Sequence, residues 1–184
     1  MALIGLDGSV DWLPLPNIHS RPVFARLVDE SSGGCIQLAP VDEYEVSRRY
    51  VENTNVLETT FTTRTGVATL TDAMVTGIAG RLPWAELARR VEGVSGEVEF
   101  AWCVQPGTML RSAAPWTERI DGFSVMRVDH VSLAVVGQDH GIHGEPDAGS
   151  ESIDGGFTTT KGSRHLLVLA ATEGEPLRVP DAAN

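Results

Sequence analysis

Apolar and polar side chains alternate along most of this chain with a period of two residues. Between Val98 and Val104 every second side chain is large and apolar, and those between are small or acidic. Residues 44–50 and 57–61 repeat this alternation. Because successive side chains of a β-strand point to opposite faces, the pattern predicts strands with one buried face. Further strands are predicted over residues 66–75, 87–94, 123–128, 131–136, 157–160 and 165–171.

Short turn sequences containing glycine separate these segments. They occur at residues 32–34, 65–66, 93–96, 121–122 and 154–156. Short strands at such spacing are typical of an antiparallel sandwich or barrel and not of alternating strands and helices. The chain is therefore predicted to be all-β.

Two segments depart from the strand pattern. Ser20, Arg21 and Pro22 resemble a helix start, which predicts one or two helical turns through Val28. Residues 82–90 fit a helix or a strand equally well.

The chain of 184 residues is long enough for one domain with a substantial core. Residues 137–156 are rich in Gly, Asp, Ser and Glu, which predicts a long loop. Residues 174–184 contain few core-forming side chains and are expected to be a tail or a truncated linker. One domain is thus predicted over residues 1–173.

Net charge narrows the possible partners. Twenty-five acidic against 14 basic side chains give a formal charge of −11, which argues against nucleic acid and anionic membranes as main partners. There is no apolar run long enough for a transmembrane helix, and the first residues lack the basic segment of a signal peptide. Cys35 and Cys103 are expected to be buried thiols, which together with the other features predicts a cytoplasmic protein.

No short sequence motif gives strong evidence for a catalytic or metal-binding site. Gly93-Val94-Ser95-Gly96 nearly matches a nucleophile elbow, but a hairpin turn is expected there, with Ser95 as an ordinary turn residue. Asp139, His140 and His143 lie in a segment predicted to be a loop, so neither a metal site nor a cofactor is predicted. Trp102 falls on an apolar strand face and is expected in the core, whereas Trp12 and Trp116 lie beside turns and prolines.

Several sequence blocks occur in the order found in one known family. They are residues 2–13, 15–16, 20–25, 47–50, 54–59, 70–72, 89–96 and 115–116. Across most of residues 2–128 the chain resembles the start of bacterial glycoside hydrolase family 15 proteins, the glucoamylase and trehalase group.

The resemblance implies a trehalase-like N-terminal domain, an antiparallel β-supersandwich that precedes an (α/α)6 barrel. In that family the barrel carries two catalytic glutamates that hydrolyse α-glucosidic bonds with inversion, which requires space for a water between the carboxyl groups. No segment of this chain matches the barrel, so no catalytic residue is predicted here. The Arg-Phe-Asp-Ser sequence of the family reads Asn17-Ile18-His19-Ser20 in this chain.

We therefore expect a non-catalytic domain that packs on a helical barrel and supplies a loop near its active site. Candidate residues for that rim or interface are Asp11, Trp12, Asn17, His19, Arg21 and Trp116. The alternative for Asp11 is a turn cap, and for Trp12 a place in the core. Alternatives for the whole chain are a carbohydrate-binding or assembly module that contacts α-glucosides, or an inactive remnant that forms homodimers through its uncovered sheet face or its edge strands.

Overall fold

The computed structural model describes residues 1–75, 85–120, 123–137 and 151–174. All regular structure in these ranges is β-strand. The strands are β1 (Leu3–Ile4), β2 (Val10–Pro14), β3 (Pro22–Phe24), β4 (Gly34–Pro40), β5 (Tyr44–Tyr50), β6 (Leu57–Thr63), β7 (Gly66–Met74), β8 (Ala85–Pro106), β9 (Trp116–Ile120), β10 (Phe123–Val128), β11 (Val131–Gly137), β12 (Ile153–Thr160) and β13 (Arg164–Glu173). The all-β prediction is confirmed, and the described ranges contain no helix that could cross a membrane.

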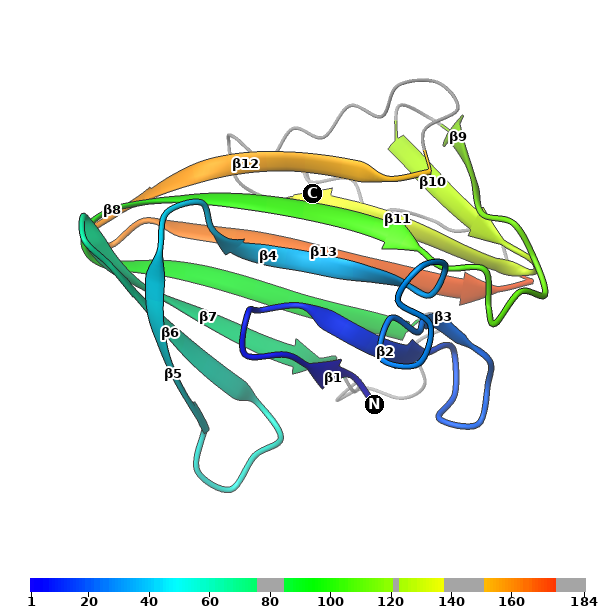
Figure 1. Ribbon diagram of the computed structural model, residues 1–184, viewed down its shortest axis with the longest axis horizontal. Coiled ribbons are helices and arrows are strands. Elements are labelled where there is room, and N and C mark those ends of the chain that lie inside the picture. The colour runs from blue at the N-terminus through cyan, green and yellow to red at the C-terminus, as the bar shows by residue number, and fades with distance from the viewer. Residues whose placement is uncertain (76–84, 121–122, 138–150, 175–184) are drawn as a thin grey trace, which may run out of the picture.

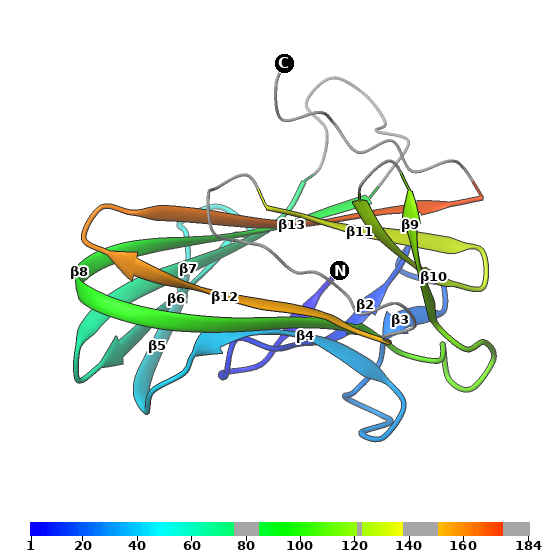
Figure 2. The same ribbon diagram turned by 90° about the horizontal axis from the view of Figure 1, so that it is seen from above.

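The strands form two layers that share β8 (Figures 1 and 2). The first half of β8 pairs with β7 and β13, and this layer continues through β6 to β5 on one side and through β11 and β10 to β9 on the other. The second half of β8 pairs with β4 and β12, and this layer continues through β2 to β1. All pairings are antiparallel, as expected for a sandwich.

The core lies between the layers and comes from the apolar positions of the alternation. Phe61 of β6 and Phe100 of β8 meet edge to face, with ring centroids 5.9 Å apart, and so connect the two layers. Phe100 also stacks on Phe157 at 5.5 Å, and Trp102 is 2 % exposed, which confirms its predicted place in the core. Aromatic pairs of this kind add to the stabilisation from burial alone.

The turns predicted at residues 93–96 and 154–156 are wrong, because β8 and β12 run through them without a break. Gly93 and Gly96 instead form an irregularity where β8 passes from one layer to the other, and the pairing with β7 shifts register there. Gly96 has a φ of +63°, and a Cβ at Gly93 would lie 2.0 Å from the Thr160 carbonyl oxygen. Glycine within a strand often marks such a bulge or a close backbone approach.

Three other predictions need correction or completion. The helical turns predicted over residues 20–28 are absent: Pro22–Phe24 is strand β3, and all three residues are buried. The ambiguous segment is strand from Ala85 onward, and residues 82–84 lie outside the described residues. The bounds of the loop predicted over 137–156 are wrong at both ends, since Gly137 belongs to β11 and β12 begins at Ile153; residues 138–150 and those from 175 lie outside the described residues.

The two cysteines are free thiols as predicted, but they are not fully buried. Cys35 of β4 pairs with Gln105, and Cys103 pairs with Gln37, so the cysteines are diagonal neighbours on one face. Both are half-buried, and burial raises the pKa of each thiol.

Candidate functional site

Three loops gather at one end of the sandwich, formed by residues 15–21, 25–33 and 107–115 (Figure 1). The Gly107 amide donates to the Val23 carbonyl at 2.8 Å, which ties the third loop to the strand that follows the first. The Thr108 amide donates to the Ser32 carbonyl at 2.9 Å, which ties it to the second loop. We call this surface the loop end.

Large apolar side chains are exposed at the loop end. Ile18 is 67 % exposed, Leu27 60 %, Val28 63 % and Leu110 48 %. Exposed apolar side chains that gather on one surface are typical of a site for contact with another protein surface.

The backbone of the third loop is strained. Met109, Leu110 and Arg111 have φ values of 48°, 59° and 65°, so three consecutive non-glycine residues are left-handed. This conformation costs roughly 1–2 kcal/mol per residue. It is held by the Thr108 carbonyl, which accepts from the amides of Ser112 and Ala113, and by the burial of Met109. Such strain persists where surrounding contacts impose it, and it is often found at functional sites.

Asp11 of β2 holds the second loop in place. Its Oδ1 accepts from Nε and Nη2 of Arg26 at 2.8 and 2.7 Å, and its backbone carbonyl accepts from the Leu27 amide. Ser9 Oγ donates to Oδ2 at 2.9 Å. Asp11 therefore positions the loop that exposes Leu27 and Val28. A hollow of about 480 Å³ lies beside it, lined by Asp7, Asp11, Arg26, Leu27, Val28 and Glu30.

Asp7 and Asp11 are the two carboxylates that come close together at this hollow. Burial raises the pKa of Asp7, but the hydrogen bonds from Ser9 and the charge of Arg26 outweigh it, so the net pKa is lowered. A general acid for glycoside hydrolysis needs a raised pKa to stay protonated. Asp7 therefore lacks the raised pKa of a general acid, and its contacts with Ser9 and Arg26 are those of a positioning network.

Asp29 organises the same loop. Its carboxylate accepts from Ser32 Oγ at 2.6 Å, from Ser31 Oγ at 3.0 Å and from the Ser32 amide at 3.1 Å. These hydrogen bonds lower the pKa of Asp29 to about 2. Arg111 Nε lies 3.7 Å from Oδ2, which joins the second and third loops.

The titration of Asp29 is a direct test of this network. We expect the carboxyl carbon of Asp29 to titrate near pH 2 in an NMR experiment, against an ordinary value of 3.8. Because the folded pKa is the lower one, these bonds contribute stability above the ordinary value, and this contribution is lost as the pH falls toward 2. Ser32→Ala should raise the midpoint, and an unchanged midpoint would contradict the assigned cause.

The other predicted residues of the first loop are surface residues. Asn17, His19 and Arg21 are exposed, and the loop is closed by the Ser20 amide on the Asn17 carbonyl at 3.0 Å. Trp12 is half-buried and pairs with Leu3 of β1. None of these four residues lines the hollow beside Asp11.

Trp116 lies apart from the Asp11 network, at the start of β9. It is 51 % exposed, and the Arg127 guanidinium lies 5.6 Å from the centre of its ring. Neither Trp116 nor Arg127 lines the hollow beside Asp11.

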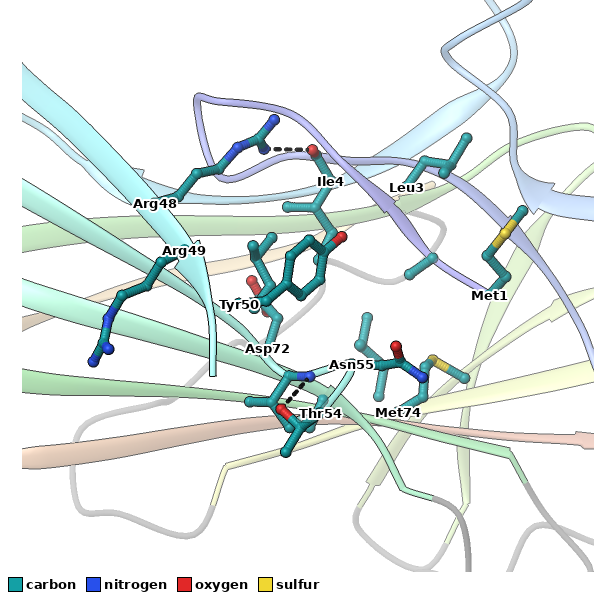
Figure 3. Close-up of a pocket in the computed structure, with 15 residues that line it drawn as sticks. Met1, Leu3, Ile4, Arg48, Arg49, Tyr50, Thr54, Asn55, Asp72 and Met74 are labelled. Atoms are coloured by element: carbon teal, nitrogen blue, oxygen red, sulfur yellow. Dashed lines mark hydrogen bonds between the residues drawn. The ribbon is translucent and has the colours of Figure 1, made fainter. Parts of the chain in front are cut away.

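A second hollow, of about 1050 Å³, lies between β1 and the strands β5 to β8 (Figure 3). Arg48 crosses toward β1 and donates to the Ile4 carbonyl at 2.9 Å. Apolar side chains from both layers line the hollow, and Asp72 lies among them. Its full lining is Met1, Ala2, Leu3, Ile4, Arg48, Arg49, Tyr50, Thr54, Asn55, Val56, Leu57, Asp72, Ala73, Met74 and Leu87.

Asp72 belongs to a buried ion pair that connects the layers. Arg89 Nε donates to Asp72 Oδ1 at 2.6 Å, and both side chains are 1 % exposed. Arg89 Nη2 donates to the Gly8 carbonyl, also at 2.6 Å. Arg89 therefore fixes the turn between β1 and β2 onto the first layer, and both residues lie in blocks that carry the family resemblance.

Neither the buried Asp72–Arg89 pair nor Arg26 is among the functional residues that the sequence predicts. Asp72 follows Ala68 and Leu70 on the inward face of β7, and Arg89 lies between Leu87 and Val91 on that of β8. Opposite charges at inward positions of two strands were the available signal. Arg26 has no comparable signal, because it lies in a loop, where no strand alternation marks a side chain as inward. Its partner, Asp11, lies on β2.

No group of metal-ligating side chains occurs within the described ranges. Asp139, His140 and His143 lie outside these ranges.

The sequence was compared with models of known families and with curated proteins. The sequence model of the family described as "Trehalase-like, N-terminal" matches residues 1–133. The chain belongs to this family. The trehalase of Thermoplasma acidophilum is 31 % identical over 137 residues, which cover 72 % of this chain and 23 % of that protein. The trehalase of Thermoplasma volcanium is 29 % identical over 137 residues, with 72 % and 22 % covered.

A mycobacterial relative is matched over a similar share of its own length. The trehalase of Mycolicibacterium smegmatis is 32 % identical over 136 residues, which cover 62 % of this chain and 20 % of that protein. This trehalase-like N-terminal chain thus spans less than a quarter of the length of the curated relatives that it matches.

Proposed function

We propose that this chain is the non-catalytic N-terminal sandwich of a trehalase-type glycoside hydrolase, in which a helical barrel hydrolyses an α-glucosidic bond. The observation that carries the proposal is the match to about a fifth of each trehalase, together with the apolar loop end. In this arrangement Leu27, Val28 and Leu110 contact the barrel. Asp11 positions the contact through Arg26, and the first loop, with Asn17, His19 and Arg21, lies toward the rim of the active site.

The carbohydrate-binding alternative has weaker support. Such modules usually present exposed aromatic rings side by side. The exposed aromatic side chains in the described ranges are Tyr50 and Trp116. They lie on β5 and β9, at opposite edges of the first layer.

The purified chain is expected to be folded and all-β by circular dichroism and to release no glucose from trehalose or maltose. In the proposed arrangement the catalytic groups belong to the barrel, in the part of a trehalase that this chain does not match. Hydrolysis by the chain alone, lost on replacement of a single carboxylate such as Asp11→Asn, would overturn the proposed non-catalytic role.

The proposed contact surface has its own test. The chain is fused in place of the matched region of the Thermoplasma acidophilum trehalase, and the fusion is assayed on trehalose. We expect Leu27→Asp with Val28→Asp to reduce activity at least tenfold, because two charges would be buried at the interface. Val94→Asp, at an exposed position of β8 outside the three loops, is the control and should leave activity unchanged. Equal activity of all three fusions would exclude the loop end as the contact.

A further inference from the structure

β5 leaves one edge of the first layer open. It pairs with β6 on one side, and no strand within the described ranges pairs with its other side. Figure 1 shows the β5–β6 hairpin at the margin of the molecule. An open edge of seven residues presents unpaired backbone donors and acceptors, which favour pairing with another strand.

The sequence of β5 is complementary to itself. In an antiparallel pairing of two copies centred on Ser47, Glu45 of each copy lies opposite Arg49 of the other. Tyr44 then lies opposite Tyr50, and no two like charges face each other. Opposite charges directly across an antiparallel pair stabilise it, and like charges destabilise it.

The side chains of the pair are available. Glu45 and Arg49 are both exposed, and although Arg49 contributes to the lining of the hollow beneath β1, Figure 3 shows its guanidinium extending away from the other labelled residues. Arg49 Nε and Nη2 both bond Glu58 Oε1 at 2.7 Å. A guanidinium has five N–H donors, so Arg49 retains donors for a second carboxylate. Arg48, on the opposite face of β5, donates to the Ile4 carbonyl and does not take part in the Glu45–Arg49 contacts.

We propose that β5 is the interface of a symmetric dimer, in which the first layers of two copies join into one continuous sheet. Because the interface has two-fold symmetry, the Glu45–Arg49 contact forms twice, once in each direction. An edge of this length buries less than the roughly 1,200 Å² of a typical stable interface, so the dimer is expected to form only at high protein concentration. Each copy carries a charge of −11, and salt near 0.15 M screens this repulsion beyond about 8 Å while it spares direct contacts.

Sedimentation velocity on the full chain from micromolar to millimolar concentration tests the dimer. We expect Glu45→Arg and Arg49→Glu each to weaken it about tenfold or more, because each variant sets like charges opposite each other at both contacts. An equimolar mixture of the two variants should restore dimerisation. One variant then presents two cations and the other two anions, so both contacts are complementary again.

Glu99→Arg and Arg119→Glu are the controls, since they make the same charge changes at exposed positions on β8 and β9. Both should dimerise like the natural chain. Arg49→Glu also removes the bond to Glu58, so the thermal unfolding of every variant is measured to confirm that it is folded. A natural chain that stays monomeric at millimolar concentration overturns the proposal. So does a dimer that both variants retain, or a mixture that fails to recover it.

Discussion

Replacing Arg89 with methionine is expected to lower the free energy of unfolding by about 3–5 kcal/mol. The substitution keeps a long side chain between Leu87 and Val91 but leaves the Asp72 carboxylate buried without its counter-charge. It also removes the donor that the Gly8 carbonyl accepts at 2.6 Å. Urea denaturation followed by circular dichroism measures the loss.

Two further variants separate the ion pair from simple packing. The double variant Arg89→Met with Asp72→Leu should recover most of the lost stability, because replacing a buried pair by apolar side chains is often neutral. Arg164→Met, on neighbouring β13, breaks a pair whose Nε–Oε2 distance to Glu92 is 3.3 Å and whose arginine is 67 % exposed. It should cost less than about 1 kcal/mol. If Arg89→Met cost no more than this control, the pair would have no role in joining the layers.

The two layers could be predicted because alternation reports directly which face of a strand is buried. Val98, Phe100, Trp102 and Val104 were expected on one face, and all four are buried. The same reasoning did not show that residues 85–106 form one strand. Glycine at residues 93–96 fits both a hairpin turn and a strand that bends, and only the partner strands β12 and β13 decide between them.

The candidate site was harder to predict because its contacts are made between distant segments. Asp11 was selected for its place in a family block, and it does hold a loop, but through Arg26, fifteen positions away. The left-handed run from Met109 to Arg111 contains no glycine or asparagine that would have signalled it. Pro22 suggested a helix start, yet its segment is buried on every residue, which an amphipathic helix would not allow.

The second large effect is expected at Gly93, where β8 passes from one layer to the other. Gly93→Val is expected to destabilise the chain by about 3 kcal/mol. A Cβ at this position would lie 2.0 Å from the Thr160 carbonyl oxygen and 2.7 Å from its carbon. These are backbone atoms, so relief requires the turn between β12 and β13 to move. That turn is held by the Gly162 amide on the Gly93 carbonyl at 2.8 Å and by the Gly93 amide on the Ser163 carbonyl at 3.0 Å.

Gly162→Ala gives the matched comparison within the same turn. Gly162 has a φ of +81° but nothing within 4 Å of an added Cβ, so alanine there incurs only the conformational cost of about 1–2 kcal/mol. Val94→Ala, beside Gly93 but exposed, should change stability by less than about 0.5 kcal/mol. Urea denaturation of the three variants ranks them, and Gly93→Val must be the least stable. If it equalled Gly162→Ala, the close approach of β8 to the Thr160 carbonyl would not be what requires glycine, and the crossing between layers would tolerate a side chain.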